Sequence, residues 1–192
     1  MTPALLTARL VLRPLTVADA DLLFDEMRDP EHFRYIPRDP PQTRDELRAM
    51  FARFAAGPAH ADETWDNWIV VRRDDEAPIG SVQLTIRQDR TATFGYWILR
   101  SQWRQGYARE ACTAVLDHLA RGRRALRAVA EIDVRNAASL ALVEALGFTR
   151  VAETANADFF KGSPSDEARY ELDLANRHTT DSRADRRNRR RR

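Results

Sequence analysis

A short loop that contains a glycine and stands directly before an amphipathic helix constrains this chain more than any other feature. Residues 103–111 read Trp-Arg-Gln-Gly-Tyr-Ala-Arg-Glu-Ala, and apolar side chains then recur at three- and four-residue spacing. This periodicity predicts a helix that begins at or just after Gly106. The apolar positions are Ala108, Ala111, Cys112, Val115, Leu116 and Leu119. The first N–H groups of such a helix lack an intrahelical partner, and with the helix dipole they favour a phosphate or pyrophosphate.

The segments on either side of this loop support a ligand site rather than a simple turn. A glycine before a helix is common in turns, so the loop alone does not distinguish the two. Residues 93–99 are rich in β-forming side chains and run into the loop, while residues 128–134 read as the next strand. Asn136 then opens a second helix, which stops at Gly147. The predicted order is strand, glycine loop, helix, strand, helix.

Five motifs along the chain resemble those of a single family. They are Thr7-Ala8-Arg9-Leu10-Val11-Leu12-Arg13-Pro14, Pro78-Ile79-Gly80-Ser81-Val82, Gly95-Tyr96-Trp97, Trp103-x-Gln105-Gly106-Tyr107-Ala108-x-Glu110-Ala111, and Asn136-x-x-Ser139 followed by Glu144-x-Leu146-Gly147-Phe148. The set is similar to the GNAT superfamily of N-acetyltransferases, and within it to the branch of ribosomal-protein alanine/serine N-terminal acetyltransferases. The resemblance predicts one GNAT domain over residues 9–174.

The resemblance implies an α+β fold with α/β/α-like layers, in which a mixed, mostly antiparallel sheet of six to seven strands is flanked by helices on both faces. The strands expected from the sequence pattern are 9–15, 65–72, 79–87, 91–100, 128–134, a strand near 148–153 and a final strand near 169–174. Thr16 with Asp19 forms a capping box that predicts a helix start. Thr43 with Glu46 forms a second one. The aromatic stretch 33–37 is expected to pack on the core or, alternatively, to take part in an acceptor pocket.

The resemblance also implies acetyl-CoA as co-substrate and assigns residues to it. The backbone amides of the loop would hold the pyrophosphate, and the strand ahead of it would pair with the pantetheine arm and offer an N–H to the thioester oxygen. The loop residues are Arg104, Gln105, Gly106, Tyr107 and Ala108, and the strand residues are Tyr96, Trp97, Ile98 and Leu99. Asn136 is explained as a helix N-cap, to which the resemblance adds a contact with the pantetheine arm.

Three residues are candidates for the chemistry itself. Ser139 is an ordinary first-turn serine by position, whereas the resemblance makes it the hydrogen-bond partner of the CoA sulfur. Asp158 lies in the run Ala157-Asp158-Phe159-Phe160-Lys161-Gly162, where the family branch has a glutamate as the proposed base. An aspartate is one methylene shorter, so a bridging water would make up the distance. Glu131 is the rival base, which would also act through water. The alternatives are that Glu131 is a strand residue facing solvent and that Asp158 is an ordinary loop acid.

The ionisation of amines favours one class of acceptor. An α-amine of pKa about 7.7 to 8.0 is roughly a tenth neutral at pH 7, while a lysine of pKa about 10.4 is neutral in about one molecule in two thousand or fewer. A carboxylate acting through water is therefore adequate for an α-amine. We predict an acetyltransferase that acts on the N-terminal α-amine of a ribosomal or other protein. The alternatives are a small-amine acetyltransferase (aminoglycoside, polyamine or amino acid) and a non-catalytic acyl-CoA-binding or RNA-associated protein.

The charge of the chain is unevenly distributed. Residues 176–192 contain eight arginines and two aspartates, so this segment carries +6, and the formal net charge of +2 leaves −4 on the rest of the chain. The segment has no apolar periodicity, which predicts a disordered arginine-rich tail over residues 175–192. The arginines from Arg183 to Arg192 would contact the phosphates of RNA or the ribosome, or they belong to a solvated extension without a partner.

Composition argues against several other classes of protein. Cys112 falls on the apolar side of the loop helix, which favours a buried small side chain over a nucleophile. The four histidines show no metal-ligand spacing, so no metal is expected. No apolar run has membrane-spanning length and no signal-peptide pattern opens the chain, so a cytoplasmic location without membrane contact is expected. A single-domain monomer or homodimer is expected.

Overall fold

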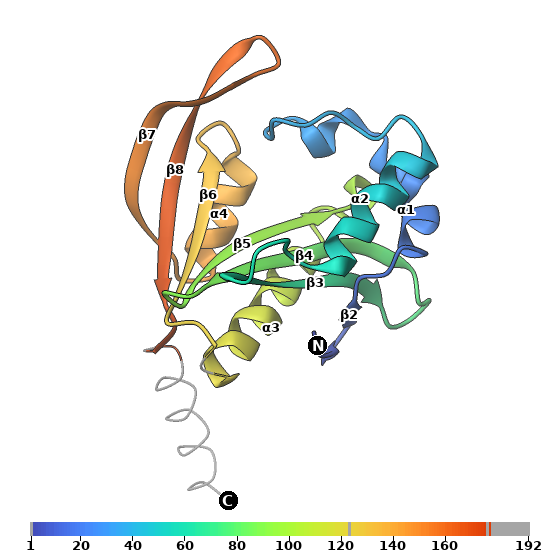
Figure 1. The fold of residues 1–192 in the computed structure, drawn as a ribbon, viewed down its shortest axis with the longest axis horizontal. Helices are drawn as coiled ribbons and strands as arrows, with labels where there is room; N and C mark the ends of the chain where they lie inside the picture. Colours follow the sequence, from blue (N-terminus) through green and yellow to red (C-terminus); the bar gives the residue numbers. More distant parts are fainter. Residues whose placement is uncertain (1, 123, 176, 178–192) are drawn as a thin grey trace, which may run out of the picture.

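The computed structural model describes residues 2–122, 124–175 and 177. In this part of the chain, eight strands form one sheet in the order β1-β2-β3-β4-β5-β6-β8-β7 (Figure 1). The strands are β1 (Leu5–Leu6), β2 (Leu10–Pro14), β3 (Glu63–Arg72), β4 (Pro78–Arg87), β5 (Thr91–Ile98), β6 (Arg127–Asp133), β7 (Thr149–Phe160) and β8 (Ser163–Asp173). The helices are α1 (Asp19–Met27), α2 (Arg44–Ala56), α3 (Tyr107–Gly122) and α4 (Ala137–Ala145), with short 3-10 helices η1 (Pro30–Phe33) and η2 (Arg100–Gln102). Neighbouring strands are antiparallel except for β5 and β6, which are parallel.

Two apolar clusters lie on opposite faces of this sheet. Strand β3 shows the division most clearly. Its Trp68 and Val70 join the cluster formed with α3 and α4, whereas Ile69 and Val71 join the cluster formed with α1 and α2. Successive side chains of a strand point to opposite faces, so a strand covered on both sides is apolar throughout. The predicted α+β fold, a mostly antiparallel sheet with helices on both faces, is confirmed.

Helix boundaries follow the capping residues in most places. The Thr43 side chain accepts a hydrogen bond from the Glu46 N–H at 3.2 Å, and α2 ends at Gly57, whose φ of 87° lies in the left-handed region. The start of α1 differs from the expected capping box. The Asp19 carboxylate accepts a bond from the Thr16 N–H at 2.8 Å, but α1 begins at Asp19 itself and no side chain caps it.

The β7–β8 hairpin is longer than the sequence pattern predicts. Instead of the short strands expected near 148–153 and 169–174, β7 and β8 have 12 and 11 residues. β7 is an edge strand that is exposed along nearly its whole length, so it has no need of an alternating apolar pattern. At the tip, Lys161 and the glycine after it have φ of 52° and 77°, which makes a two-residue type I′ turn. The unexpected β1 brings the sheet to eight strands rather than six to seven.

Strands β5 and β6 part from one another beyond their first residues. Their pairing covers three residues of β5, Thr91 to Thr93, although both strands continue further. In Figure 1 the two strands diverge beside α3 and α4. Within the described ranges, the backbone of β5 beyond Thr93 therefore has no strand partner on its β6 side. Its N–H and C=O groups on that side are open to an extended ligand, except for the Ile98 carbonyl, which accepts a bond from the Trp103 indole at 2.7 Å.

Candidate active site

The loop before α3 presents its backbone to solvent. Arg104 and Gly106 both have positive φ, 61° and 81°. Glycine adopts this conformation freely, whereas a side-chain-bearing residue adopts it less easily. Arg104, Gln105 and Gly106 are exposed, and α3 begins at Tyr107, so the N–H groups of Tyr107 and Ala108 have no carbonyl partner inside the helix. The helix start predicted at or just after Gly106 is confirmed, and the phosphate site at this loop stays a prediction.

Arg9 holds this loop from the start of the neighbouring strand β2. Its Nη1 donates to the Gln105 carbonyl at 3.0 Å and its Nε to the Glu110 carboxylate at 2.7 Å. Its guanidinium also lies 4.5 Å from the centre of the Tyr107 ring. Glu110 accepts further bonds from the Arg9 N–H at 2.8 Å and the Thr7 hydroxyl at 2.6 Å. Burial opposes the ionisation of Glu110, but these bonds outweigh burial and lower its pKa.

The clamp between Arg9 and Glu110 could not be predicted from the sequence. The two residues lie 101 positions apart in the chain, and no local pattern relates them. The only available signal was that the Arg9 motif and the loop motif both belong to the family resemblance. The clamp connects the start of β2 to the loop, because Arg9 fixes the carbonyl of Gln105, the residue that precedes Gly106.

Tyr96 of β5 and Ser139 of α4 meet beside the opening between β5 and β6. Tyr96 Oη donates to Ser139 Oγ at 2.9 Å, and the Ser139 N–H donates to the Asn136 side chain at 3.2 Å. Asn136 is therefore the N-cap of α4, as predicted. Burial raises the pKa of Tyr96 to about 12, so the phenol stays protonated. Because Ser139 Oγ accepts this bond, its own proton is available for a second partner.

The other predicted β5 residues differ in what they can offer a ligand. The Trp97 side chain packs against the cluster of α1 and α2, and Ile98 is buried in the opposite cluster. The Leu99 N–H donates to the Ile79 carbonyl of β4 at 2.8 Å, so it is not free for a thioester oxygen. Since N–H groups alternate between the two edges of a strand, those of Tyr96 and Ile98 point toward the opening.

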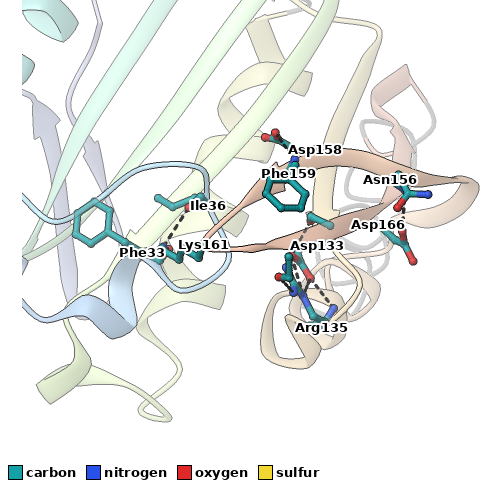
Figure 2. Close-up of polar contacts among 11 residues, drawn as sticks. Phe33, Ile36, Asp133, Arg135, Asn156, Asp158, Phe159, Lys161 and Asp166 are labelled. Atoms are coloured by element: carbon teal, nitrogen blue, oxygen red, sulfur yellow. Dashed lines mark hydrogen bonds and ion pairs between the residues drawn. The ribbon is translucent and has the colours of Figure 1, made fainter.

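The two carboxylates predicted as bases have different surroundings. Glu131 on β6 forms an ion pair with Arg169, whose Nη1 lies 2.9 Å from Glu131 Oε1. Asp158 on β7 accepts a bond from the N–H of Phe159 at 2.7 Å, and it makes no ion pair with any side chain in the described residues. Figure 2 shows its carboxylate directed away from the pair formed by Asp133 and Arg135. Of the two acids, Glu131 forms an ion pair in the described residues and Asp158 does not.

Glu167 on β8 is a third carboxylate, which the sequence analysis missed. It is half-buried and lies opposite Asp133 in the pairing of β6 with β8. Among the residues that the structure describes, none donates a hydrogen bond to it. Burial raises its pKa, and the neighbouring carboxylates of Glu131, Asp158 and Asp133 raise it further. A carboxylate with a raised pKa binds a proton more readily, which suits a general base.

Asp133, which is paired with Glu167 in the register of β6 and β8, has a structural role. Its carboxylate accepts a bond from Arg135 Nε at 2.9 Å and one from the Ser165 hydroxyl at 2.7 Å (Figure 2 shows the Arg135 contact). The bonds from Arg135 are the main cause that lowers the pKa of Asp133 to about 2. Asp133 is therefore ionised at neutral pH and is a poor proton acceptor there.

Neither a reactive thiol nor a metal cluster is present in the described residues. Cys112 is fully buried in the core, and burial raises the pKa of its thiol, so the thiolate does not form at neutral pH. No group of three or more His, Cys, Asp or Glu side chains within residues 2–122, 124–175 and 177 is arranged to hold a metal ion. In the same residues, no helix combines the length and the apolar character needed to span a bilayer.

Comparison with known proteins assigns the family. Residues 9–149 match the family model of the acetyltransferase (GNAT) domain. The chain belongs to the GNAT acetyltransferase family. This GNAT chain is an acyltransferase, and it is 28% identical over 174 residues to the uncharacterized N-acetyltransferase YoaA of Bacillus subtilis, which covers 90% of this chain and 97% of that protein.

Solved structures of other acetyltransferases share the fold. One is an acetyltransferase of Salmonella typhimurium that modifies the N-terminal serine of ribosomal protein L7/L12. It has a TM-score of 0.77 at 19% identity and covers 87% of this GNAT chain and 96% of its own. A RimL ribosomal L7/L12 alpha-N-protein acetyltransferase in complex with coenzyme A also has a TM-score of 0.77 at 19% identity, covering 89% and 98%. At this identity the likeness concerns the fold.

Proposed function

We propose that this enzyme transfers the acetyl group of acetyl-CoA to the N-terminal α-amine of a protein, in the cytoplasm. The observation that carries the proposal is the hydrogen bond from Tyr96 to Ser139 beside the parted strands. A serine placed there is the sulfur partner in the ribosomal-protein branch that the sequence resembles. The similarity in fold to enzymes that act on L7/L12 supports the same acceptor class.

The donor side of the reaction uses groups on β5, α3 and α4. The exposed amides of the loop around Gly106 would bind the pyrophosphate, because they carry the positive end of the α3 dipole. The open edge of β5 would pair with the pantetheine arm, and the N–H of Tyr96 or Ile98 would meet the thioester oxygen as it becomes an oxyanion. Both groups are preorganised, since the Arg9 clamp fixes the loop and β4 fixes the strand.

The chemical step forms a C–N bond and breaks the C–S bond. The neutral amine attacks the thioester carbon, and CoA leaves as the thiolate, to which Ser139 Oγ donates a hydrogen bond. A hydrogen bond to a charged atom stabilises it by about 1.5 to 3 kcal/mol. Tyr96 remains protonated and orients the Ser139 hydroxyl, so that its proton points to the sulfur. The ammonium formed by attack releases its proton to a carboxylate, and solvent later returns a proton to the thiolate.

Two carboxylates are suited to take the proton of the amine. Glu167 has a raised pKa and no hydrogen-bond donor in the described structure, and Asp158 has no ion-pair partner there. Glu131 is less suited because Arg169 neutralises it at 2.9 Å. We propose Glu167 or Asp158 as the base, with a bridging water where the distance requires one.

A small amine is the competing acceptor. The carboxylates of Asp158 and Glu167, which form no ion pair in the described residues, would attract any cationic amine, including a polyamine or an aminoglycoside. Purified protein should be incubated with acetyl-CoA and a panel of N-terminal peptides, polyamines, aminoglycosides and amino acids, with mass spectrometry as the readout. Acetylation of peptide α-amines is expected. Acetylation of the small amines alone would replace the proposed acceptor.

The arginines from Arg183 to Arg192 lie outside the described residues. We propose that they contact RNA of the ribosome, because clustered arginines bind phosphates without sequence preference and this segment contrasts in charge with the rest of the chain. The last residue described, Arg177, pairs with Asp117 of α3 at 2.9 Å. A truncation that tests the arginines should therefore keep Arg177.

A further inference from the structure

The chain contains one lysine, Lys161, beside thirty arginines. It occupies the tip of the β7–β8 hairpin, in the type I′ turn between the two strands. In Figure 1 this hairpin rises beyond the end of β6 and bends toward the segment that follows α1. A chain that uses arginine almost everywhere has placed its single lysine at a contact between two distant segments.

The Lys161 ammonium donates to three backbone carbonyls of that segment. Nζ bonds to the carbonyl of Phe33, to that of Ile36 at 3.3 Å and to that of Arg38 at 3.4 Å. Figure 2 shows Lys161 at the tip of the hairpin beside Phe33 and Ile36. We call this contact the Lys161 clasp, formed by Lys161 and residues 33–38. Its two sides are 128 positions apart in the chain at Phe33.

The geometry of the clasp explains why the residue is a lysine. An ammonium is a compact charge whose three N–H donors diverge from one atom, so it can serve three carbonyls that surround it. A guanidinium is planar, and its donors point outward in a fixed fork, which suits carboxylates rather than a ring of carbonyls. Substitution of Lys161 by arginine therefore keeps the charge but not the arrangement of donors.

The clasp joins the segment after α1 to the hairpin that carries the candidate base Asp158. Phe33 is buried in the cluster of α1 and α2, which also contains Trp97 of β5. Phe33 and Arg38 line a cavity of about 910 Å³ along α2. On the hairpin side, Asp158 lies three positions before Lys161, so the clasp fixes the candidate base relative to the wall of this cavity.

We propose that Lys161 is a specificity-determining residue, which sets the separation of the hairpin tip from residues 33–38 and so admits slender amine acceptors and excludes broad ones. This inference rests on the proposed function. With the clasp closed, an acceptor has to pass beside the joined segments. Loss of the clasp leaves the hairpin tip held on one side, where Arg135 donates to the Ser163 hydroxyl at 3.1 Å, and so lets the tip move away from residues 33–38 and widens the passage.

The single lysine provides a test that needs no acceptor. An amine-reactive ester modifies only Lys161 and the chain's α-amine, and peptide mapping by mass spectrometry separates the two. Because Nζ has to leave three carbonyls before it reacts, Lys161 in the native enzyme should react at least about tenfold more slowly than in the urea-unfolded chain. Equal rates in the two states would overturn the clasp.

The second measurement compares two tetrapeptides that begin with serine and have either glycine or tryptophan at the second position. The native enzyme should prefer glycine in kcat/KM. Lys161→Met should lower the ratio of kcat/KM for the glycine peptide to kcat/KM for the tryptophan peptide by about fivefold or more. Lys161→Arg, the charge-matched control, should lower this ratio less. Thermal unfolding checks that both variants are folded. An unchanged preference in folded Lys161→Met would overturn the specificity role. If the native enzyme acetylates neither peptide but does acetylate a small amine, the proposed function has failed, and the labelling rate still decides the clasp.

Discussion

Tyr96 Oη donates a hydrogen bond to Ser139 Oγ across 2.9 Å, and this bond joins strand β5 to the first turn of α4. The phenol is buried and stays protonated, because burial raises its pKa to about 12. Ser139 is also placed by the N-cap of α4, through Asn136. One contact places the backbone of Ser139 and the other orients its hydroxyl beside the open edge of β5, which is the arrangement expected for stabilising a leaving thiolate.

Removing the Ser139 hydroxyl should slow the chemical step without weakening donor binding. Ser139→Ala is expected to lower kcat by about tenfold to a hundredfold, since a hydrogen bond to a charged atom contributes about 1.5 to 3 kcal/mol. Tyr96→Phe should have a smaller effect, because it acts through Ser139. Steady-state kinetics gives kcat, and calorimetry gives the acetyl-CoA affinity. Ser101→Ala, which removes a hydroxyl bonded to Glu26 instead, is the control. A large loss of affinity in Ser139→Ala with kcat unchanged would contradict the assignment.

Glu167→Gln should reveal whether the missed carboxylate is the base. The expected loss in kcat/KM near neutral pH is about a hundredfold or more. The loss should shrink as the pH passes about 7.7 to 8.0, because the α-amine then arrives neutral. Glu171→Gln is the matched control, since Glu171 is on the same strand but is held by Arg127 and Arg169.

Variants of Asp158 and Glu131 give the results that would contradict Glu167 as the base. A larger and pH-rescued defect in Asp158→Asn than in Glu167→Gln would assign the base to β7, and the same result in Glu131→Gln would assign it to β6. Native rates in all three variants would mean that solvent takes the proton.

The ionised carboxylate of Glu167 is also expected to lower the free energy of unfolding at neutral pH. Its pKa in the folded state lies above the ordinary value of 4.5. The folded state thus binds this proton more tightly than the unfolded chain, and stability falls as pH rises from 4.5 through the folded pKa. Glu167→Gln removes this loss, so its Tm should exceed that of the native enzyme at pH 7 and the gain should vanish below about pH 4. A lower Tm at pH 7 would show that the ionised form is stabilised instead.

Local sequence signals were sufficient for the elements that position the donor. The helix start at Gly106, the N-cap at Asn136 and the helix end at Gly147 each depend on one or two residues and their neighbours. These features could be predicted because capping and left-handed turns are short-range effects. The family resemblance carried by the five motifs added the fold class.

The candidate base Glu167 and the long-range polar contacts could not be predicted in the same way. Glu167 faces Asp133 only through the register of β6 with β8, and an exposed edge strand such as β7 leaves no apolar pattern from which register follows. The contacts of Arg9 and Lys161 join segments more than a hundred positions apart. Long-range polar contacts of this kind have no local signature, so the three-dimensional structure is needed to find them.

Variants of the phosphate loop and of the Arg9 clamp are expected to lose affinity for CoA selectively. Gly106→Val should raise the Kd for CoA at least about tenfold, because φ of 81° is strained for a β-branched residue and the loop amides would shift. Arg9→Met should raise it less, since the Gln105 carbonyl loses one donor and Glu110 loses its cation. Acetyl-pantetheine, which lacks the phosphates, is the control donor, and its kcat/KM should be unchanged in both variants. Equal defects with both donors would indicate general disruption rather than lost phosphate binding.

Truncation after Arg177 tests the arginine-rich stretch apart from catalysis. The truncated enzyme keeps the ion pair of Arg177 with Asp117 and all strands of the sheet, so its Tm and its turnover of a short peptide should match those of the full chain. Retention on immobilised ribosomal RNA should differ. The full chain should bind at low salt and be released as salt rises, because phosphate contacts displace condensed counterions. The truncated enzyme should bind weakly at every salt concentration.

Replacement of Arg189, Arg190, Arg191 and Arg192 by serine should lower the slope of the logarithm of the RNA-binding constant against the logarithm of salt concentration, in proportion to the charges removed. Equal retention of the full and truncated proteins across the salt series would eliminate the RNA contact while leaving the acetyltransferase assignment intact.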